Sequence, residues 1–165
     1  MSKKKAYKIV LVDDDPFIQE MVKDYVTDHF PNFFLKIYPT GEEALIGSRR
    51  TPDLIILDFE LNGQTPAAAN GLLVLPELKT RFPSSPIVMF TAQDNLQIAT
   101  ATVREGALDY IVKNETAMSR LGLLLRKIES DKSIHESRDK SKTLSIVLVG
   151  LIMLLIVIIV VLLMN

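Results

Sequence analysis

The sequence predicts an α/β domain, a doubly wound sheet of five parallel strands, followed by one C-terminal transmembrane helix. Two observations predict the domain. Five short apolar runs rich in β-branched residues lie between residues 8 and 112, and each is followed by a segment with apolar residues at helical spacing. Strict alternation of strands and helices indicates parallel strands with helices on both faces. A third observation predicts the membrane helix, because the last 22 residues contain no charge.

The first half of the domain begins with a strand over residues 8–12. Asp15 is expected to cap the following helix, with Pro16 at its first position. Residues 33–38 read as the second strand, and Thr40 with Glu43 has the spacing of a capping box that opens a short helix.

The second half starts with residues 53–57, an apolar run without alternation, as expected for a strand buried on both faces. We expect three further helices, over residues 72–82, 94–105 and 115–128, and two further strands, over 86–90 and 107–112. Asp94 and Gln97 have capping-box spacing at the start of the second of these helices.

Composition excludes several classes of function. The 165 residues contain 19 Lys and Arg against 20 Asp and Glu, so binding of nucleic acid through bulk positive charge is not expected. The absence of Cys excludes disulfides, thiolate zinc sites and a cysteine nucleophile.

The uncharged segment 144–164 is 21 residues long. As a helix it would span roughly 32 Å, close to the thickness of the hydrocarbon core of a bilayer. Arg138, Lys140 and Lys142 precede it, which predicts a single-pass protein with its N-terminus in the cytoplasm, on the cytoplasmic face of the inner membrane. We therefore expect a domain over 1–129, a polar linker over 130–143 and a span over 144–164. A buried core helix or a removed targeting segment are the alternatives.

Chemistry-bearing residues follow four of the predicted strands. Ligands of open parallel sheets bind beyond the carboxyl ends of the strands. In the common strand order 2-1-3-4-5, three carboxylates would converge there, and oxygen-only ligands favour Mg²⁺ or Mn²⁺. A lysine and a hydroxyl opposite them would suit a phosphoryl group. Taken singly, each residue also has a plain structural explanation, as a helix start, a turn or a solvated loop charge; the candidates are Asp13, Asp14, Asp58, Thr91 and Lys113.

Four motifs make the chain resemble the receiver domain of bacterial response regulators, which has a flavodoxin-like fold. They are IVLVDDDP (9–16), PDLIILD (52–58), PIVMFTA (86–92) and GALDYIVK (106–113). The resemblance implies that Asp58 is the phosphoacceptor and that Thr91 and Lys113 contact its phosphate. It further implies a metal site for Mg²⁺, or Mn²⁺, and a switch formed by Thr91 and Tyr110. The implied metal ligands are Asp13, Asp14, Asp58 and the backbone carbonyl of Glu60.

The chain departs from the family pattern in three places. Lys113 is followed by Asn114 where the family commonly has a cis proline, so a trans bond and an altered loop are expected, which puts the reach of Lys113 in question. An insertion is expected within residues 64–70. Glu60 and Gln93 occupy positions that tune dephosphorylation in the family.

The resulting interpretation is a membrane-tethered, single-domain response regulator, a signalling protein rather than an enzyme. A histidine kinase or histidine phosphotransfer protein would donate the phosphoryl group to Asp58, and the output would be protein contact. Direct nucleic-acid binding is not expected, and a homodimer is an open alternative. The competing functions are a phosphorylation-independent membrane adaptor with a receiver fold and, with little support, a haloacid-dehalogenase-type phosphatase.

Overall fold

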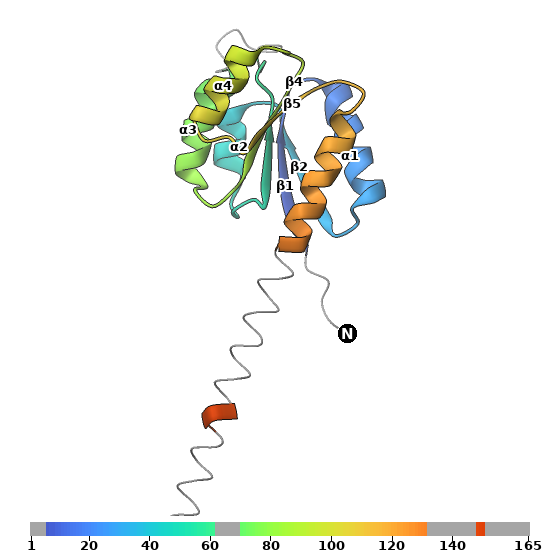
Figure 1. Ribbon diagram of the computed structural model, residues 1–165, viewed down its shortest axis with the longest axis vertical. Coiled ribbons are helices and arrows are strands. Elements are labelled where there is room, and N and C mark those ends of the chain that lie inside the picture. The colour runs from blue at the N-terminus through green and yellow to red at the C-terminus, as the bar shows by residue number, and fades with distance from the viewer. Residues whose placement is uncertain (1–5, 62–69, 132–147, 151–165) are drawn as a thin grey trace, which may run out of the picture. The chain divides into compact units, whose positions relative to one another are not determined.

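The computed structural model describes residues 6–61, 70–131 and 148–150. The chain divides into two units, residues 1–123 and 124–165. In the second unit the described residues, 124–131 and 148–150, are helical. The first unit contains strands and helices in alternation (Figure 1), in the order β1 (Tyr7–Val12), α1 (Pro16–His29), β2 (Phe33–Tyr38), α2 (Gly41–Gly47), β3 (Leu54–Leu57), α3 (Gly71–Arg81), β4 (Ile87–Thr91), α4 (Leu96–Arg104) and β5 (Asp109–Val112). A further helix begins at residue 117.

The five strands form one parallel sheet in the order β2-β1-β3-β4-β5, as predicted. Figure 1 shows α2, α3 and α4 on one side of this sheet and α1 on the other. The predicted α/β fold class is therefore confirmed, and each crossover returns the chain to the same end of the sheet.

The central strands are buried on both faces, which explains their unbroken apolar sequences. All residues of β3 and β4 are buried, and β1 has one residue that is only half-buried. The core between the sheet and α2 and α3 includes Ile55, Leu57 and Met89 from the strands and Leu75 and Leu78 from α3. This packing holds the ends of β1, β3 and β4 in a fixed relation.

Two of the predicted helix caps are confirmed. Asp15 accepts a hydrogen bond from the backbone N–H of Phe17 at 2.8 Å, and Pro16 opens α1. The hydroxyl of Thr40 accepts one from the N–H of Glu43 at 3.2 Å. Both caps lie beside the carboxyl end of the sheet, where they set the direction of the loops that enter α1 and α2.

The predicted cap of α4 is wrong. Asn95 takes this position, and its side chain accepts from the N–H groups of Gln97 and Ile98. Asp94 is therefore one residue too early. The strand predicted from residue 107 also begins later, at Asp109, because the N–H of Ala107 bonds to the carbonyl of Thr102 in the turn that ends α4.

The predicted membrane span and linker mostly lie outside the described residues. Of the span 144–164, only 148–150 are described, and of the linker 130–143, only 130 and 131. Within the described ranges no helix has the length and apolar character required to cross a bilayer. The span over 144–164 stays a prediction.

Candidate functional site: an acidic cluster facing a lysine

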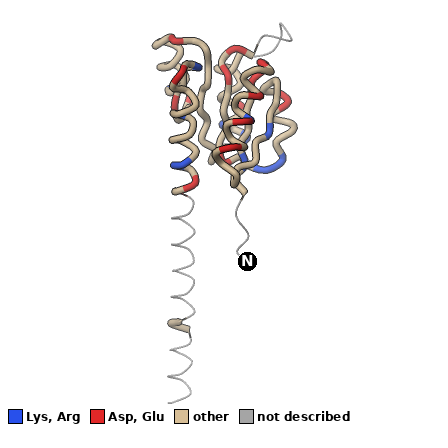
Figure 2. The backbone as a smooth tube through the Cα atoms, turned by 90° about the vertical axis from the view of Figure 1, so that its right-hand side faces the viewer, with Lys and Arg blue, Asp and Glu red and all other residues tan. Residues whose placement is uncertain are grey.

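The sequence-predicted site residues meet at the carboxyl edge of the sheet. Asp13 and Asp14 follow β1, Asp58 follows β3, Thr91 is the last residue of β4, and Lys113 follows β5. Carboxylate oxygens of Asp13, Asp14 and Asp58 all lie within 4.8 Å of one another. Figure 2 shows acidic positions at the end of the first unit where the strands finish, with others distributed over the rest of the unit.

Lys113 bridges the two buried carboxylates of this cluster. Its Nζ lies 2.8 Å from Oδ2 of Asp13 and 2.9 Å from Oδ2 of Asp58. The main chain of Lys113 is fixed beside β4, because its N–H bonds to the carbonyl of Thr91 at 2.7 Å. The side chain of Lys113 therefore reaches both Asp13 and Asp58.

Asn114 does not prevent this reach, although it stands where the family has proline. The described peptide bonds are all trans. The side chain of Asn114 instead accepts hydrogen bonds from the N–H and the hydroxyl of Thr116, at 3.0 and 2.8 Å. These bonds order the loop before the helix that begins at residue 117, so an asparagine turn replaces the proline turn.

Backbone groups orient the two buried carboxylates. Oδ1 of Asp13 accepts from the N–H of Asp15 at 3.0 Å, and Oδ1 of Asp58 accepts from the N–H of Phe59 at 2.7 Å. The side-chain amide of Gln19 in α1 donates to the backbone carbonyl of Asp13 at 2.6 Å. Each carboxylate therefore has one oxygen bound to the backbone and the other directed at Lys113.

Burial dominates the electrostatics of the cluster. Loss of solvation raises the pKa of Asp13 to about 6, even though Lys113 opposes the shift. Burial likewise raises the pKa of Asp58, again against the effect of Lys113. Burial would lower the pKa of Lys113, but the charges of Asp58 and Asp13 more than offset it, and that pKa is raised. The lysine is thus firmly protonated.

The donor set fits a hard divalent cation. Three carboxylates face one ammonium group, so the cluster carries excess negative charge when all are ionised. The ligands are oxygens only, and an open hollow of about 610 Å³ beside them leaves room for metal-bound water. Its lining includes Asp14, Asp58, Glu60 and Lys113. The residues present are therefore compatible with Mg²⁺ or Mn²⁺.

A contact between two loops borders this hollow. The side-chain amide of Gln93, in the loop after β4, donates to Oε1 of Glu60, in the loop after β3, at 2.6 Å. Sequence reasoning singled out both positions but not their bond, because they are 33 residues apart.

Gln93 also connects the site to Tyr110. The N–H of Gln93 donates to the hydroxyl of Thr91 at 3.2 Å, and its carbonyl accepts from the hydroxyl of Tyr110 at 2.5 Å. Thr91 is fully buried. The predicted switch pair, Thr91 and Tyr110, is thus joined through the backbone of one residue.

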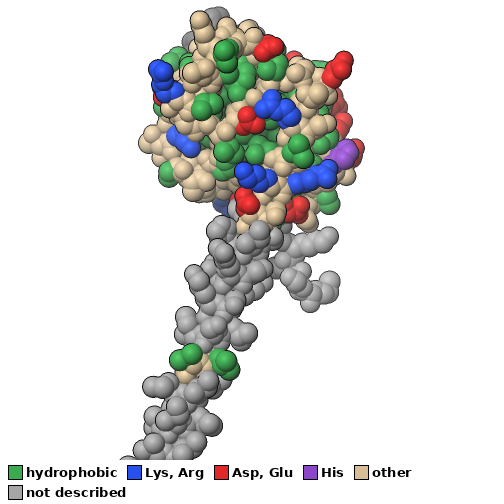
Figure 3. Space-filling model, viewed as in Figure 1, with side chains coloured by type: hydrophobic (Ala, Val, Ile, Leu, Met, Phe, Trp, Pro, Cys, Tyr) green, Lys and Arg blue, Asp and Glu red, His purple; other side chains and the backbone are tan. Residues whose placement is uncertain are grey.

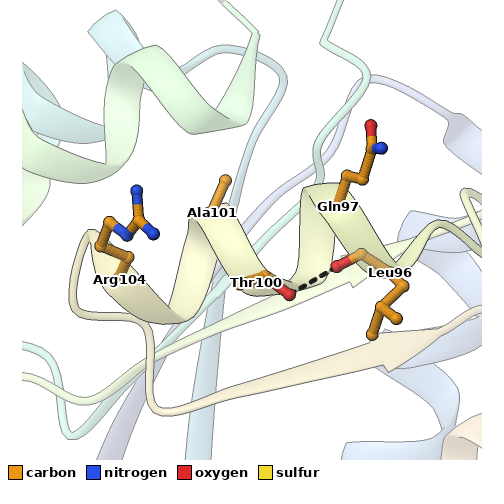
Figure 4. Close-up of a pocket in the computed structure, with 5 residues that line it drawn as sticks. All are labelled: Leu96, Gln97, Thr100, Ala101 and Arg104. Atoms are coloured by element: carbon orange, nitrogen blue, oxygen red, sulfur yellow. Dashed lines mark hydrogen bonds between the residues drawn. The ribbon is translucent and has the colours of Figure 1, made fainter.

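The loop after Gln93 leads into α4, whose outer face carries a shallow hollow of about 360 Å³ (Figure 4). The side chain of Leu96 at the start of this hollow is 82% exposed. The hollow mixes apolar and polar groups, and its lining consists of Leu96, Gln97, Thr100, Ala101 and Arg104. Its first residue lies three positions after Gln93.

Gly71, the first residue of α3, packs directly against the backbone of Asp58. A Cβ atom at this position would lie 2.0 Å from the carbonyl oxygen of Asp58 and 2.9 Å from its carbonyl carbon. The N–H of Gly71 also bonds to the carbonyl of Phe59 at 2.9 Å. The predicted insertion at 64–70 lies outside the described residues except for Asn70, which caps α3.

The sheet and the acidic cluster at its edge define an α/β domain with a site compatible with metal binding. Comparison with protein families specifies the domain. The family model of the response regulator receiver domain matches residues 9–124, so the chain belongs to the response regulator receiver family. A receiver is a signalling phosphoacceptor domain and not an enzyme of the usual kind, and receiver domains interact with histidine kinases or phosphotransfer proteins.

Two relatives illustrate the match. The nitrogen assimilation regulatory protein NtrX of Azorhizobium caulinodans is 32% identical over 134 residues, which are 81% of this chain and 29% of NtrX. The glycerol metabolism activator of Pseudomonas putida is 30% identical over 110 residues, 66% of this chain and 48% of the relative. The chain therefore spans less than half the length of these two proteins.

Solved structures agree on the fold. The receiver domain of NtrX from Brucella abortus is 30% identical, with a TM-score of 0.63 over 73% of this chain and 96% of that one. A CheY-like receiver domain protein from Methanospirillum hungatei has a TM-score of 0.66 at 22% identity, over 78% and 98% of the two chains. The second likeness concerns the fold alone.

Proposed function

We propose that this protein is a response regulator that accepts a phosphoryl group on Asp58 from a histidine kinase or histidine phosphotransfer protein, and that a C-terminal helix tethers it to the membrane. The observation that carries the phosphoacceptor role is the position of Lys113 between Asp13 and Asp58, inside a cluster of three carboxylates. A structural ion pair needs one carboxylate, and the surplus negative charge suits a divalent cation, which together with Lys113 would attract a phosphoryl group to Asp58.

In the transfer, an oxygen of the Asp58 carboxylate attacks phosphorus. The O–P bond forms as the P–N bond to the donor histidine breaks, and the imidazole leaves with the electron pair. Lys113, already 2.9 Å from Asp58, neutralises charge on the phosphoryl oxygens. Thr91 and the backbone N–H of Phe59 orient the acceptor and its product.

Asp13, Asp14, Asp58 and the backbone carbonyl of Glu60 are the groups that would hold Mg²⁺ or Mn²⁺. The bound cation would supply positive charge to the phosphoryl oxygens. The backbone bonds to Asp13 and Asp58 keep these carboxylates oriented in advance, so binding requires little rearrangement.

The output is a change in the surface near α4. Phosphorylation adds charge beside Thr91. The hydrogen bonds that join Thr91 to Gln93 and Gln93 to Tyr110 carry that change to the loop before α4 and to its exposed hollow. A partner protein that reads this face would distinguish the two states.

The membrane tether is supported by the sequence of the tail. Residues 144–164 are long enough to span a bilayer as a helix and contain no charge, and three basic residues precede them within seven positions. Tethering would raise the concentration of the receiver near membrane-bound kinases without any additional contact.

The phosphoacceptor role is tested with acetyl phosphate or a kinase and Mg²⁺, read by intact mass. The wild-type chain is expected to gain one acid-labile phosphate, and Asp58→Asn none, while Asp28→Asn on α1 serves as the matched control and labels normally. Absence of label on wild type, where a control receiver is labelled, would instead support the phosphorylation-independent adaptor.

The tether is tested by fractionation. The full chain is expected in the membrane fraction and to require detergent for release, and deletion of residues 144–165 is expected to move it to the supernatant. Full-length protein already in the supernatant without detergent would contradict the tether.

A further inference from the structure

A cluster of cations and exposed hydrophobic side chains lies along β2, the edge strand of the sheet, and the neighbouring helix α2. The parallel register places Lys8 of β1 beside Phe34 of β2, and Lys36 lies two residues further along the same face of β2. The loop after α2 adds two exposed arginines. We call this surface the β2–α2 patch, and its members are Lys8, Phe34, Lys36, Ile46, Arg49 and Arg50.

Hydrogen bonds to neutral oxygens hold the patch together. The ammonium group of Lys8 donates to the hydroxyl of Ser48 and to the carbonyl of Arg50, each at 2.7 Å. Lys36 donates to the carbonyl of Gly47, the last residue of α2, at 3.1 Å. The loop that carries Arg49 and Arg50 is therefore fixed to the sheet.

In these bonds the ammonium groups meet neutral oxygens, and the carboxylate of Asp53, which accepts from the backbone N–H of Lys8 at 2.7 Å, offsets only part of the positive charge. Burial together with the nearby charges of Lys36 and Arg50 lowers the pKa of Lys8, which shows how closely the cations are crowded. Like charges at this spacing repel one another. An external anionic surface would relieve the repulsion. The sequence adds three more lysines at positions 3–5, directly before the described residues.

Two large hydrophobic side chains accompany the cations. Phe34 is 62% exposed and Ile46 is 84% exposed. On the face of the molecule drawn in Figure 3, cations, carboxylates and hydrophobic side chains are interspersed. Basic residues combined with exposed aromatic and aliphatic ones are typical of surfaces that bind the headgroup region of anionic membranes.

We infer that the β2–α2 patch docks the domain on an anionic lipid surface, with Lys8, Lys36, Arg49 and Arg50 on the lipid phosphates and Phe34 and Ile46 at the headgroup boundary. The inference rests on the proposed membrane tether, which supplies the high local lipid concentration that so small a patch needs. Docking leaves the phosphoacceptor site accessible. Lys8 and Phe34 are the second residues of their strands, whereas Asp13 and Asp58 follow the ends of theirs.

The test uses the full chain in vesicles of phosphatidylcholine, with or without added phosphatidylglycerol. Because the chain contains no Cys, an environment-sensitive dye can be placed at one position by Ile46→Cys. The emission maximum of the dye is expected to shift to shorter wavelength only in the anionic vesicles. Its fluorescence is also expected to be quenched by headgroup-labelled lipid only there. Salt at 1 M, where the screening length is about 3 Å, is expected to abolish the shift. A dye at Phe17→Cys, a residue 72% exposed at the start of α1, is the positional control and is expected not to respond.

Charge reversal supplies the matched pair of variants. Arg49→Glu with Arg50→Glu is expected to remove the anionic response. Lys23→Glu with Lys79→Glu, on α1 and α3, makes the same change in net charge and is expected to preserve it.

Flotation of the same samples separates the possible failures. Protein that floats with both kinds of vesicle but gives one emission spectrum contradicts the docking alone. Protein that floats with neither kind of vesicle contradicts both the tether and the docking. Protein that floats only with anionic vesicles contradicts the tether and the premise that the patch needs it, while the assignment of the patch to anionic lipid stands. If polyglutamate shifts the emission of the dye at position 46 and vesicles do not, the patch binds an acidic protein and the assignment to lipid is wrong.

Discussion

The side-chain amide of Gln93 donates a 2.6 Å hydrogen bond to Oε1 of Glu60, and this bond joins the two loops that border the acidic hollow. Glu60 lines the hollow beside Asp58, and so does Ala92, the residue before Gln93. The bond therefore restrains the two loops that line the hollow, one of which leads to α4.

Loss of this bond is expected to shorten the lifetime of the phosphorylated state. In Gln93→Ala the loops after β3 and β4 lose the hydrogen bond that joins them, so water should reach Asp58 more easily. An exposed hydrogen bond contributes about 0.5–1.5 kcal/mol, which corresponds to a roughly two- to tenfold faster dephosphorylation. The measurement is the decay of acid-labile phosphate after removal of the donor. Glu60→Ala should give a similar rate of dephosphorylation, and the double variant should be little faster than either single variant. If the two substitutions instead multiply each other's effect on the rate, they do not act through one shared bond.

Lys113 is expected to stabilise the fold by separating Asp13 from Asp58. In Lys113→Met two buried carboxylates face each other without a cation, so stability at pH 8 in EDTA should fall by about 3–5 kcal/mol. The loss should shrink at pH 5.5, because Asp13, whose pKa is already raised to about 6, takes up a proton. Denaturant unfolding at the two pH values measures both effects. Lys23→Met on the exposed side of α1 should change stability by no more than about 0.5 kcal/mol; an equal loss in both variants would show that the cluster does not need Lys113.

Mg²⁺ binding is expected to weaken as the pH falls. The pKa of Asp13 is raised to about 6 and that of Asp58 is raised as well, so both carboxyls take up protons at a higher pH than an ordinary aspartate. A protonated carboxyl is a poor ligand, and affinity should drop by up to about tenfold per pH unit below the pKa for each proton displaced. Calorimetry at pH 7.5 and 5.5 suits a chain without Trp. The dependence should be weaker in Asp13→Asn, and equal affinities of the wild type at both pH values would argue against Asp13 as part of the metal site.

Gly71 is expected to be required for the geometry of Asp58. In Gly71→Ala the new methyl group would collide with the carbonyl oxygen of Asp58, and this atom belongs to the backbone and cannot rotate away. Stability should fall by about 1–3 kcal/mol, and labelling of Asp58 should slow further than stability alone explains. Gly150→Ala is the matched control, since its Cβ meets no atom within 4 Å. Normal labelling of Gly71→Ala would mean that the loop after β3 shifts to accommodate the methyl group without displacing the carboxylate of Asp58.

The sequence predicted the sheet because its central strands have an unusual signature. Residues 54–57 are all buried, so they show no alternation, and an apolar run that ends in Asp58 marks both a buried strand and the edge it reaches. Helix boundaries were less predictable. Asp94 and Asn95 are both residue types that cap helices well, and in the structure it is Asn95 that has the extended backbone and accepts the hydrogen bonds of the cap.

The finer geometry of the site depends on contacts between distant segments. Asn114 replaces the proline of the family pattern, yet Lys113 reaches both Asp13 and Asp58, and the loop after it is closed by hydrogen bonds from Thr116 to the side chain of Asn114. The bond between Gln93 and Glu60 and the packing of Gly71 on Asp58 arise only when the loops after β3 and β4 close over the sheet edge. No periodicity or local propensity encodes such contacts.

The separation of charge along the strands has an electrical consequence. The carboxylates of Asp13, Asp14 and Asp58 meet where β1 and β3 end, whereas Lys8 lies near the start of β1 and Lys36 lies within β2. These two groups of charge form a local dipole along β1 and β2, although Asp53 and Asp109 place further carboxylates near the starts of β3 and β5, and the whole chain has a formal net charge of −1. In the field of a negatively charged surface this local dipole contributes a torque before any contact forms, over a distance of about 10 Å at 0.1 M salt. The torque turns the acidic cluster away from the surface, so orientation precedes binding and does not depend on a specific complementary shape.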